Sequence, residues 1–425
     1  MGSKLDELGQ SASSPTGIWL RELAAAVPAL AGLLAASPEE QTARGYMHTL
    51  HEICQQPLTW PETSAIAAAH RDVLARAVRG ARGEAPAEAI VLTGSGSSMY
   101  AATCLALPLQ ESLQVPVLCI SGGQLLTDGW RALPLGKPTL VISFARSGNS
   151  PESIAAVDQL LEDHPACRHL VITCNASGKL VTSHAGNPRV SSLTLADRTC
   201  DRSLVMTSSF TNMVLAGLSL AFLDRWAQYR GMVAMLASAA RRLLLSHTGC
   251  LAEVARGNFN SAVFLGSGPN FGAAMESALK LVEISGGRVR TFAETYLGLR
   301  HGPLAAVHDD TLVVCFLSSD PLVRAYEQDL IQELNRKQLG FAKAIVGEGI
   351  PPELLNEGDL AVECPGLAAA GDDAAPVLHA IAGQLIGLFR SLKEGLHPDS
   401  PSVNGAINRV VESFQIHRPS PRDRE

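Results

Sequence analysis

The stretch AIVLTGSGSS, residues 89–98, decides the fold because it joins an all-apolar run to a Ser/Gly turn. A strand without polar alternation is typical of a sheet covered on both faces, hence of a parallel α/β layer. Comparable apolar runs, separated by longer helix-like stretches, follow at residues 139–144, 169–174, 262–267 and 311–316. The sequence therefore predicts an α/β protein with parallel sheets.

Two features of this stretch recur farther along the chain at one offset. The Gly-Ser-Gly triplets begin at Gly94 and Gly266, and the strand-like runs TLVI and TLVV begin at Thr139 and Thr311. The separation is 172 residues in both cases, 266 minus 94 and 311 minus 139. We infer a duplicated domain, with the copies meeting between residues 222 and 259 and each expected to be a doubly wound parallel sheet.

The remaining segments divide around these two copies. Residues 1–84 are rich in Ala, Leu, Glu and Gln, which predicts a helical N-terminal segment. We expect the first copy to span residues 85–240 and the second residues 250–395. The turn residues of 396–425 favour a closing segment over a helix, and its last seven residues, Pro419 to Glu425, are typical of a disordered tail.

Composition excludes several classes of protein. With 46% hydrophobic and 18% charged residues among 425, the chain is expected to be soluble and globular. A net charge of -7 supplies no basic field for nucleic acid. The nine scattered cysteines, never spaced as CxxC, indicate neither a disulfide framework nor a zinc knuckle and fit a reducing cytoplasm.

One apolar run, residues 23–36, has to be distinguished from a targeting segment. It contains Pro28 and Gly32, is shorter than a membrane span, and follows acidic residues where a signal peptide has basic ones. We expect part of an N-terminal helix there. The sequence thus predicts no membrane and no nucleic-acid partner.

Two Ser/Gly turns of the first copy are candidate phosphate sites. One is GSGSS at residues 94–98 and the other is RSGNSPES at residues 146–153, each directly after a predicted strand. Such turns expose N–H groups and hydroxyls beside a helix N-terminus, which suits an anion. A single turn is explained equally well by a Ser N-cap, but two in consecutive units favour a ligand crevice above the sheet. In the second copy, LSSDP at residues 317–321 adds Asp320, so we expect phosphate in the first copy only.

The stretch ESALKLVEIS, residues 276–285, predicts a helix with Glu276 and Glu283 nearly on one face. A carboxylate held beside a sugar can move a proton between adjacent carbons. We expect Glu276 and Lys280 to form an exposed i,i+4 ion pair, whereas Glu283 lies deeper in the apolar run. His301 follows on a Gly-Pro loop, where it is either solvated or a partner of Glu283.

The sequence argues against two other chemistries, a metal site and a hydrolase nucleophile. His301 and His308, with Asp309 and Asp310, could suggest a metal, but the Gly-Pro break and the lack of HExxH argue against a metal site. Ser97 or Ser147 could suggest a hydrolase nucleophile, but no GxSxG elbow is present.

Over residues 45–417 the ordered motifs GSGSS, SFARSGNSPES, ESALKLVEIS and RHGPL resemble the SIS (sugar isomerase) phosphosugar-binding superfamily. Together with Asp201-Arg202, MTSS at residues 206–209 and NRVV at residues 408–411, they resemble in particular the AgaS-type D-galactosamine-6-phosphate deaminase/isomerase family, formerly described as tagatose-6-phosphate ketose/aldose isomerases. The isomerase half of glucosamine-6-phosphate synthase is a more distant relative. The first 85 residues are too few for its glutaminase domain, so we expect ammonia release rather than synthesis.

The resemblance implies roles for individual residues. Glu283 would move the proton between C1 and C2, and His301 would assist ring opening, as a histidine from the neighbouring subunit does in the synthase relative. The substrate-binding residues expected from the turns and the resemblance are Ser95, Gly96, Ser97, Ser98, Arg146, Ser147, Gly148, Asn149, Ser150, Ser208 and Ser209.

Two departures from the relatives affect what can be carried over. The synthase relative has an active-site lysine near its C-terminus, where this chain offers Asn404, Asn408 and Arg409. Ahead of RHGP the AgaS family favours Ser-Pro-Thr-Gly, whereas residues 295–298 read Thr-Tyr-Leu-Gly, which leaves galacto and gluco configurations open.

We therefore expect an enzyme that opens a 2-amino-2-deoxyhexose 6-phosphate, D-galactosamine 6-phosphate by resemblance, and releases ammonia to leave tagatose 6-phosphate. No metal or redox cofactor is required, since proton transfer and imine hydrolysis need only positioned acids, bases and water. The alternatives are aldose/ketose isomerisation without deamination and a non-catalytic sugar-phosphate sensor. The expected assembly is a homodimer or larger homo-oligomer with shared active sites, the substrate lying between the two domains.

Overall fold

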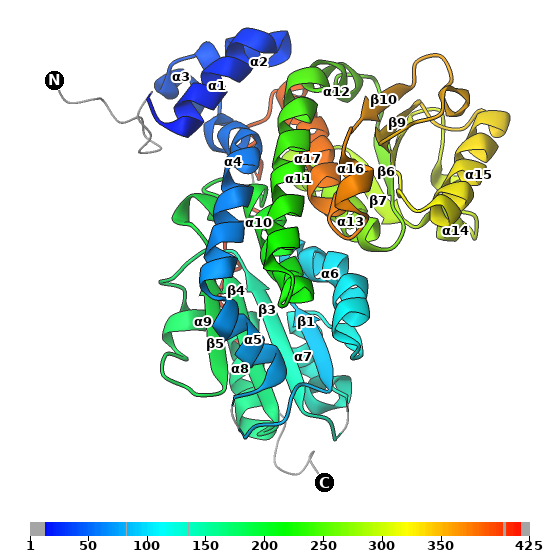
Figure 1. Ribbon diagram of the computed structural model, residues 1–425. Helices are drawn as coiled ribbons and strands as arrows, with labels where there is room; N and C mark the ends of the chain where they lie inside the picture. The colour runs from blue at the N-terminus through cyan, green and yellow to red at the C-terminus, as the bar shows by residue number, and fades with distance from the viewer. Residues whose placement is uncertain (1–12, 82, 135, 403–404, 418–425) are drawn as a thin grey trace.

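The chain forms two five-stranded parallel sheets with helices packed on their faces (Figure 1). The computed structural model describes residues 13–81, 83–134, 136–402 and 405–417. The predicted disordered tail, Pro419 to Glu425, lies outside the described residues. The α/β fold class with parallel sheets and a helical N-terminal segment, predicted from the sequence, is confirmed.

The first sheet has the strand order β2-β1-β3-β4-β5. Its strands are β1 (Ala89–Thr93), β2 (Val117–Cys119), β3 (Thr139–Ala145), β4 (Cys167–Thr173) and β5 (Val190–Thr194). Every residue of β1 and β3 is buried, as their unbroken apolar runs predicted. The helices of this half are α6 (Ser97–Leu113), α7 (Gly122–Asp128), α8 (Pro151–Asp163), α9 (Lys179–Thr182) and α10 (Ser208–Leu218).

The second sheet repeats this order, since β7-β6-β8-β9-β10 is the same path read from the opposite edge. Its strands are β6 (Ser261–Leu265), β7 (Arg290–Glu294), β8 (Thr311–Phe316), β9 (Ala342–Gly347) and β10 (Leu360–Glu363). The helices are α13 (Pro269–Ile284), α14 (Tyr296–Leu299), α15 (Pro321–Lys337), α16 (Leu367–Ala370) and α17 (Ala375–Lys393).

The 172-residue offset of the sequence corresponds to matching strand register. Ala89 of β1 pairs with Thr139 of β3, and Ser261 of β6 pairs with Thr311 of β8. Both partners are therefore shifted by the same 172 residues, 261 minus 89 and 311 minus 139. The two central strand pairs thus occupy equivalent places in the two sheets.

Helices at the N-terminus and between the sheets join the two halves. The N-terminal helices are α1 (Pro15–Ala26), α2 (Pro28–Ala35), α3 (Pro38–Ala43), α4 (Met47–Ala69) and α5 (Arg71–Arg79), and the linking helices are α11 (Trp226–Ser246) and α12 (Thr248–Ala255). Short 3₁₀ turns are η1 (Gly129–Ala132), η2 (Asp197–Thr199), η3 (Ser219–Phe222), η4 (Pro303–Ala306) and η5 (Pro352–Leu354). The apolar run at residues 23–36 is two helices instead of one, because Pro28 starts α2 after a break at Val27.

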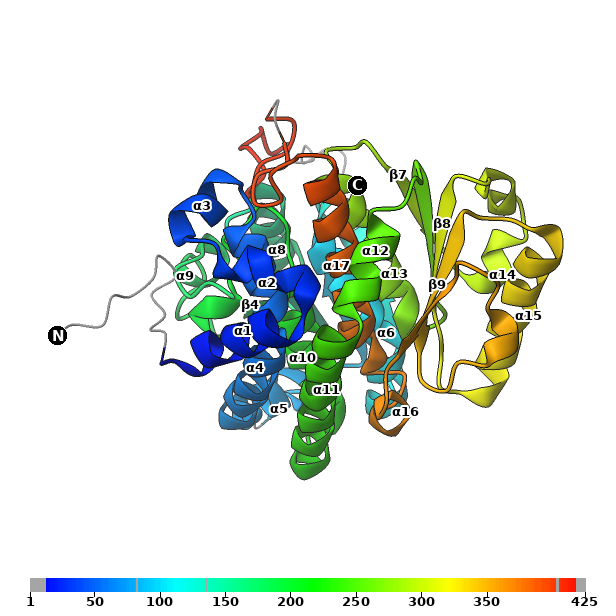
Figure 2. The ribbon, with the colours of Figure 1, turned by 90° about the horizontal axis from the view of Figure 1, so that it is seen from above.

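Two glycines let the central helices α6, α13 and α17 approach closely (Figure 2). A Cβ at Gly272 of α13 would lie 2.8 Å from the carbonyl oxygen of Tyr100 in α6. A Cβ at Gly383 of α17 would overlap the Ser277 side chain of α13. As a result α13, from the second half, is pressed against α6, which begins at the first Ser/Gly turn.

Helix α17 is the one helix among the described residues that is long and apolar enough to cross a membrane. Its apolar 18-residue window has a mean hydropathy of 1.2 and is 94% buried inside the fold. The helix packs against α13, α12 and α10, so it is accounted for as a core helix.

Candidate active site

A cavity of about 270 Å³ lies at the carboxyl ends of β1 and β3 and is lined from both halves of the chain. These strands flank the point where the strand order of the first sheet reverses, which is where α/β sheets bind ligands. Of the predicted residues, it is lined by Ser95, Gly96, Ser97, Ser98, Arg146, Ser147, Gly148, Ser150 and Glu283. The structure therefore brings the two Ser/Gly turns and the predicted base to one place.

The hydroxyls of the turns are not used for helix capping. Ser150 is the N-cap residue of α8, but its side chain makes no capping hydrogen bond. The N-cap of α6 is Gly96, with φ at 55°, a conformation that favours glycine. Ser147 Oγ accepts the Asn149 N–H at 3.2 Å and keeps its own proton to donate. The ordinary N-cap explanation therefore does not account for these serines, and the anion-binding interpretation is favoured.

In the second copy, carboxylates of the chain itself accept hydrogen bonds from the N–H groups of the corresponding turn. Glu327 accepts the Ser318 N–H at 2.8 Å, and Asp372 accepts the Ser319 N–H at 2.6 Å. Asp320 caps α15 by accepting the N–H groups of Leu322 and Val323 at 2.9 and 3.0 Å. Because these N–H donors are already occupied, the turn of the second copy is a much weaker anion-binding site than the turns of the first.

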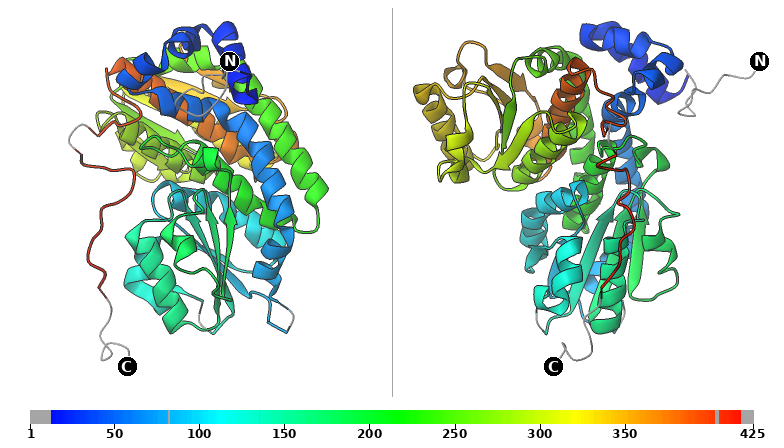
Figure 3. Two further views of the ribbon diagram at one scale, coloured as in Figure 1. Left: turned by 90° about the vertical axis from the view of Figure 1, so that its left-hand side faces the viewer. Right: turned by 180° about the vertical axis from the view of Figure 1, so that it is seen from behind.

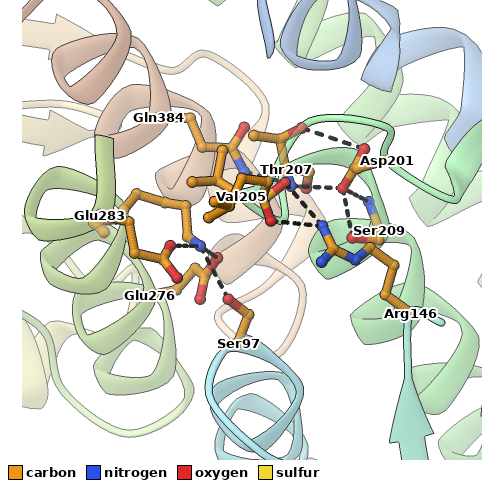
Figure 4. Close-up of polar contacts among 12 residues, drawn as sticks. Ser97, Arg146, Asp201, Val205, Thr207, Ser209, Glu276, Glu283 and Gln384 are labelled. Carbon is orange, nitrogen blue, oxygen red and sulfur yellow. Dashed lines mark hydrogen bonds and ion pairs between the residues drawn. The ribbon is translucent and has the colours of Figure 1, made fainter. Parts of the chain in front are cut away.

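Lys280 joins the two halves beside the cavity by contacting Ser97 of α6 and Glu276 and Glu283 of α13. These three partners are labelled in Figure 4. Lys280 Nζ donates to Ser97 Oγ at 3.1 Å, lies 3.4 Å from Glu276 Oε1, and forms a closer ion pair with Glu283. The predicted exposed pair of Glu276 and Lys280 is wrong, since both side chains are 0% exposed while Glu283 is 21% exposed. The reason is that α13 is covered by α6 and α17, which periodicity within one helix does not reveal.

Burial sets the charges of this cluster. Burial raises the pKa of Glu276 to about 8, and the neighbouring Glu283 carboxylate adds to the increase. Burial alone would lower the pKa of Lys280, but the two carboxylates outweigh it and raise that pKa above its ordinary value. Burial thus disfavours the charged form of Glu276, although the Lys280 ammonium opposes this shift, and Lys280 forms its closer ion pair with Glu283. Of the two acids, only Glu283 lines the cavity, which suits it to be the base.

Arg146 lines the cavity, but its guanidinium points to the backbone. It donates to the carbonyls of Ser203, Leu204 and Val205 at 2.9–3.2 Å and to that of Arg409 at 2.6 Å. Arg146 thus holds the neighbouring chain segments in place around the cavity.

Four predicted site residues do not line this cavity. The hydroxyls and N–H groups of Ser208 and Ser209 all bond to the Asp201 carboxylate at the start of α10. Asn149 Oδ1 accepts the Lys179 N–H at 3.0 Å. His301 is exposed on the turn after α14. Ser208, Ser209 and Asn149 therefore support the walls of the site, whereas His301 faces solvent.

The C-terminal segment, predicted as a closing segment, forms one wall of the cavity. Ile407, Asn408, Arg409 and Val411 line the cavity, and the segment runs back along the half that contains the first sheet (Figure 3). Arg409 Nε donates to the Asp201 carbonyl at 2.9 Å, which fixes the segment there. Among the described residues, no group of three His, Cys, Asp or Glu side chains is arranged to hold a metal.

Over most of its length the chain is similar to AgaS proteins and to a tagatose-6-phosphate ketose/aldose isomerase of known structure. No protein-family model matches it. An AgaS protein of Streptomyces coelicolor is 38% identical over 381 residues, covering 87% of this chain and 95% of the relative. The D-galactosamine-6-phosphate deaminase AgaS of Shewanella sp. strain ANA-3 is 34% identical over 394 residues, covering 90% and 94%. The crystal structure of tagatose-6-phosphate ketose/aldose isomerase from Escherichia coli matches with a TM-score of 0.78 and 30% identity, covering 88% and 97%.

The Ser147 and Ser150 hydroxyls of the first copy lead to a prediction about phosphate binding. Changing Ser147→Ala together with Ser150→Ala removes two donors to a charged group, each worth about 1.5–3 kcal/mol, so the Kd for inorganic phosphate should rise at least about tenfold. The matched control is Ser318→Ala with Ser319→Ala in the second copy, which should leave that Kd unchanged. Isothermal titration checks both. A larger effect in the control than in the first-copy variant would place phosphate in the second copy.

Proposed function

We propose that this chain, which belongs to the AgaS family of D-galactosamine-6-phosphate deaminases, releases ammonia from D-galactosamine 6-phosphate and leaves tagatose 6-phosphate. The observation that carries the proposal is that Glu283 and the serine hydroxyls of both Ser/Gly turns of the first copy line one cavity. In this proposal the serine hydroxyls bind the phosphate, and Glu283 reaches the carbons at the opposite end of the sugar.

In the proposed reaction, the ring-opened sugar presents its C2–H bond to Glu283. The carboxylate removes this proton, the C–H electron pair forms the C1–C2 double bond, and the carbonyl pair of C1 moves to its oxygen, which takes a proton from water to give an enolamine and hydroxide. Glu283 returns the proton to C1 while the nitrogen lone pair forms an iminium at C2. Hydroxide adds to C2, a proton moves from the new hydroxyl to the nitrogen, and the C–N bond breaks as the C2 carbonyl forms and ammonia leaves. General-base catalysis of this kind contributes about 10²–10⁴-fold in rate.

Lys280 supports Glu283 in this proposal. Its ammonium is buried against the carboxylate, so it holds Glu283 in one rotamer and keeps it ionised, without itself lining the cavity. A non-catalytic sensor would need neither the base nor this buried cation. Isomerisation without deamination uses the same base and differs in the group on C2, so the two reactions are separated by assay.

The proposed location is the cytoplasm. All nine cysteines are described as free thiols, which fits a reducing compartment.

The proposed substrate is tested by measuring ammonia release. D-Galactosamine 6-phosphate should give ammonia and ketohexose 6-phosphate in equal amounts, and Glu283→Gln should lower kcat by about 10²–10⁴-fold with phosphate binding retained. Glu253→Gln on the exposed face of α12 is the matched control and should keep full activity. The proposal fails if tagatose 6-phosphate is isomerised while neither galactosamine nor glucosamine 6-phosphate yields ammonia. The base assignment fails if Glu283→Gln keeps more than about a third of kcat.

We also propose that His301 completes the site of a neighbouring subunit. Two observations support this: His301 is exposed instead of lining its own cavity, and Leu297, one turn earlier, is 46% exposed. Beside Glu283 there is also a hollow of about 550 Å³, bordered by Val282, Leu396 and Pro401. An apolar hollow of this size can receive a loop of a second copy.

Mixing two inactive variants tests the shared site. Glu283→Gln and His301→Ala should each be inactive alone, but after subunit exchange a mixed dimer contains one site with both groups intact. The expected result is recovery of ammonia release up to about half of the wild-type rate per mixed dimer. Exchange verified by mass spectrometry without any recovery would show that His301 serves its own chain.

A further inference from the structure

Glu152 is a carboxylate at the cavity that the proposed reaction does not use. It is the second residue of α8, two positions after Ser150, and it lines the same cavity as Ser147, Ser150 and Glu283. Glu152 is 9% exposed, and its Oε2 is buried without a hydrogen-bond partner. Among the described residues, no ion pair or hydrogen bond to this side chain is present.

A buried carboxylate without a partner calls for an explanation, because native proteins pair nearly all such groups. Asp201 shows the usual situation, since it accepts hydrogen bonds from Thr207, Ser208 and Ser209. Glu152 borders the cavity, and of its two oxygens only Oε2 is sealed from solvent, so a ligand in the cavity can donate to Oε1 of this unpaired carboxylate. Since an ionised carboxylate only accepts hydrogen bonds, that donor is a hydroxyl or an amine, not the phosphate.

The position of Glu152 limits which part of the sugar it can meet. The phosphate on C6 is assigned to the hydroxyls of Ser147 and Ser150, and C1 and C2 are assigned to Glu283. Glu152 follows Ser150 within the first turn of α8, so it stands at the phosphate end of the cavity. The hydroxyls within its reach are therefore those on C3, C4 and C5.

Only one of these three carbons differs between the two amino-sugar phosphates considered. Galactosamine and glucosamine 6-phosphate share the configuration of C3 and C5 and differ at C4. A site that accepts a hydrogen bond from one C4 epimer leaves a buried carboxylate unpaired with the other, and such a mismatch discriminates more strongly than apolar shape does.

We propose that Glu152 accepts a hydrogen bond from the C4 hydroxyl of the substrate and thereby selects the galacto configuration. The inference rests on the proposed function for the orientation of the sugar in the cavity. It assigns Glu152 a role in specificity, separate from the proton transfer by Glu283.

The test measures binding without turnover. Three proteins are compared in the Glu283→Gln background: the parent with Glu152 intact, Glu152→Gln and Glu152→Ala. For each, the Kd is measured for galactosamine 6-phosphate, glucosamine 6-phosphate and inorganic phosphate. Glu152→Ala should weaken binding of the galacto epimer at least about tenfold and that of the gluco epimer less than about threefold. Glu152→Gln keeps a neutral acceptor and should fall between. Unchanged phosphate binding shows that each variant is folded.

The matched control is Glu162→Gln, an exposed acid on the same helix, which should alter none of the three Kd values. The inference is overturned if Glu152→Ala weakens both epimers equally, which would indicate a hydroxyl on C3 or C5. It is also overturned if binding is unchanged, or if the parent protein does not distinguish the epimers. Failure of ammonia release with the epimer preference intact would instead overturn only the proposed reaction.

Discussion

The site depends on the interactions that the buried ammonium of Lys280 makes. Its side chain is fully buried, and its partners come from both halves of the chain: Ser97 from the first, Glu276 and Glu283 from the second. A buried cation is tolerated only when its partners are correctly placed, since removal of one partner leaves an uncompensated charge. The approach of α13 to α6, which requires Gly272, is therefore linked to the placement of the base beside the phosphate turns.

The two sheets share one strand order but divide the chemistry between them. In the first, the Ser150 hydroxyl makes no capping hydrogen bond and no carboxylate occupies the described turn donors, whereas in the second Glu327 and Asp372 accept from the equivalent N–H groups. Conversely, Glu283, the proposed base, is carried by α13 of the second half. Neither half contains a complete site, which explains why the cavity is found at their junction and is closed by the C-terminal segment at residues 407–411.

Strands and turns could be predicted from the sequence because their signals are local. Apolar runs such as residues 139–144 give the parallel sheets, and the Ser/Gly turns follow them directly. The burial of Lys280 could not be predicted, because i,i+4 spacing is the same for exposed and buried pairs and only packing by α6 and α17 distinguishes them. Ser208 and Ser209 turn to the Asp201 carboxylate, which precedes them by only seven and eight residues but is brought to them by the turn before α10. The role of residues 407–411 depends on contacts more than 200 positions away in the chain.

The most direct test of this account is the kinetic effect of Lys280→Met, which keeps an unbranched side chain one atom shorter and removes its charge. If the buried ammonium joins the base to the phosphate turns, kcat for ammonia release should fall at least about a hundredfold, a loss of about 2.7 kcal/mol in transition-state stabilisation. The Kd for inorganic phosphate should change less than about threefold, because the turns themselves are intact. A variant that binds phosphate normally and keeps kcat within about threefold of the wild type would contradict the account.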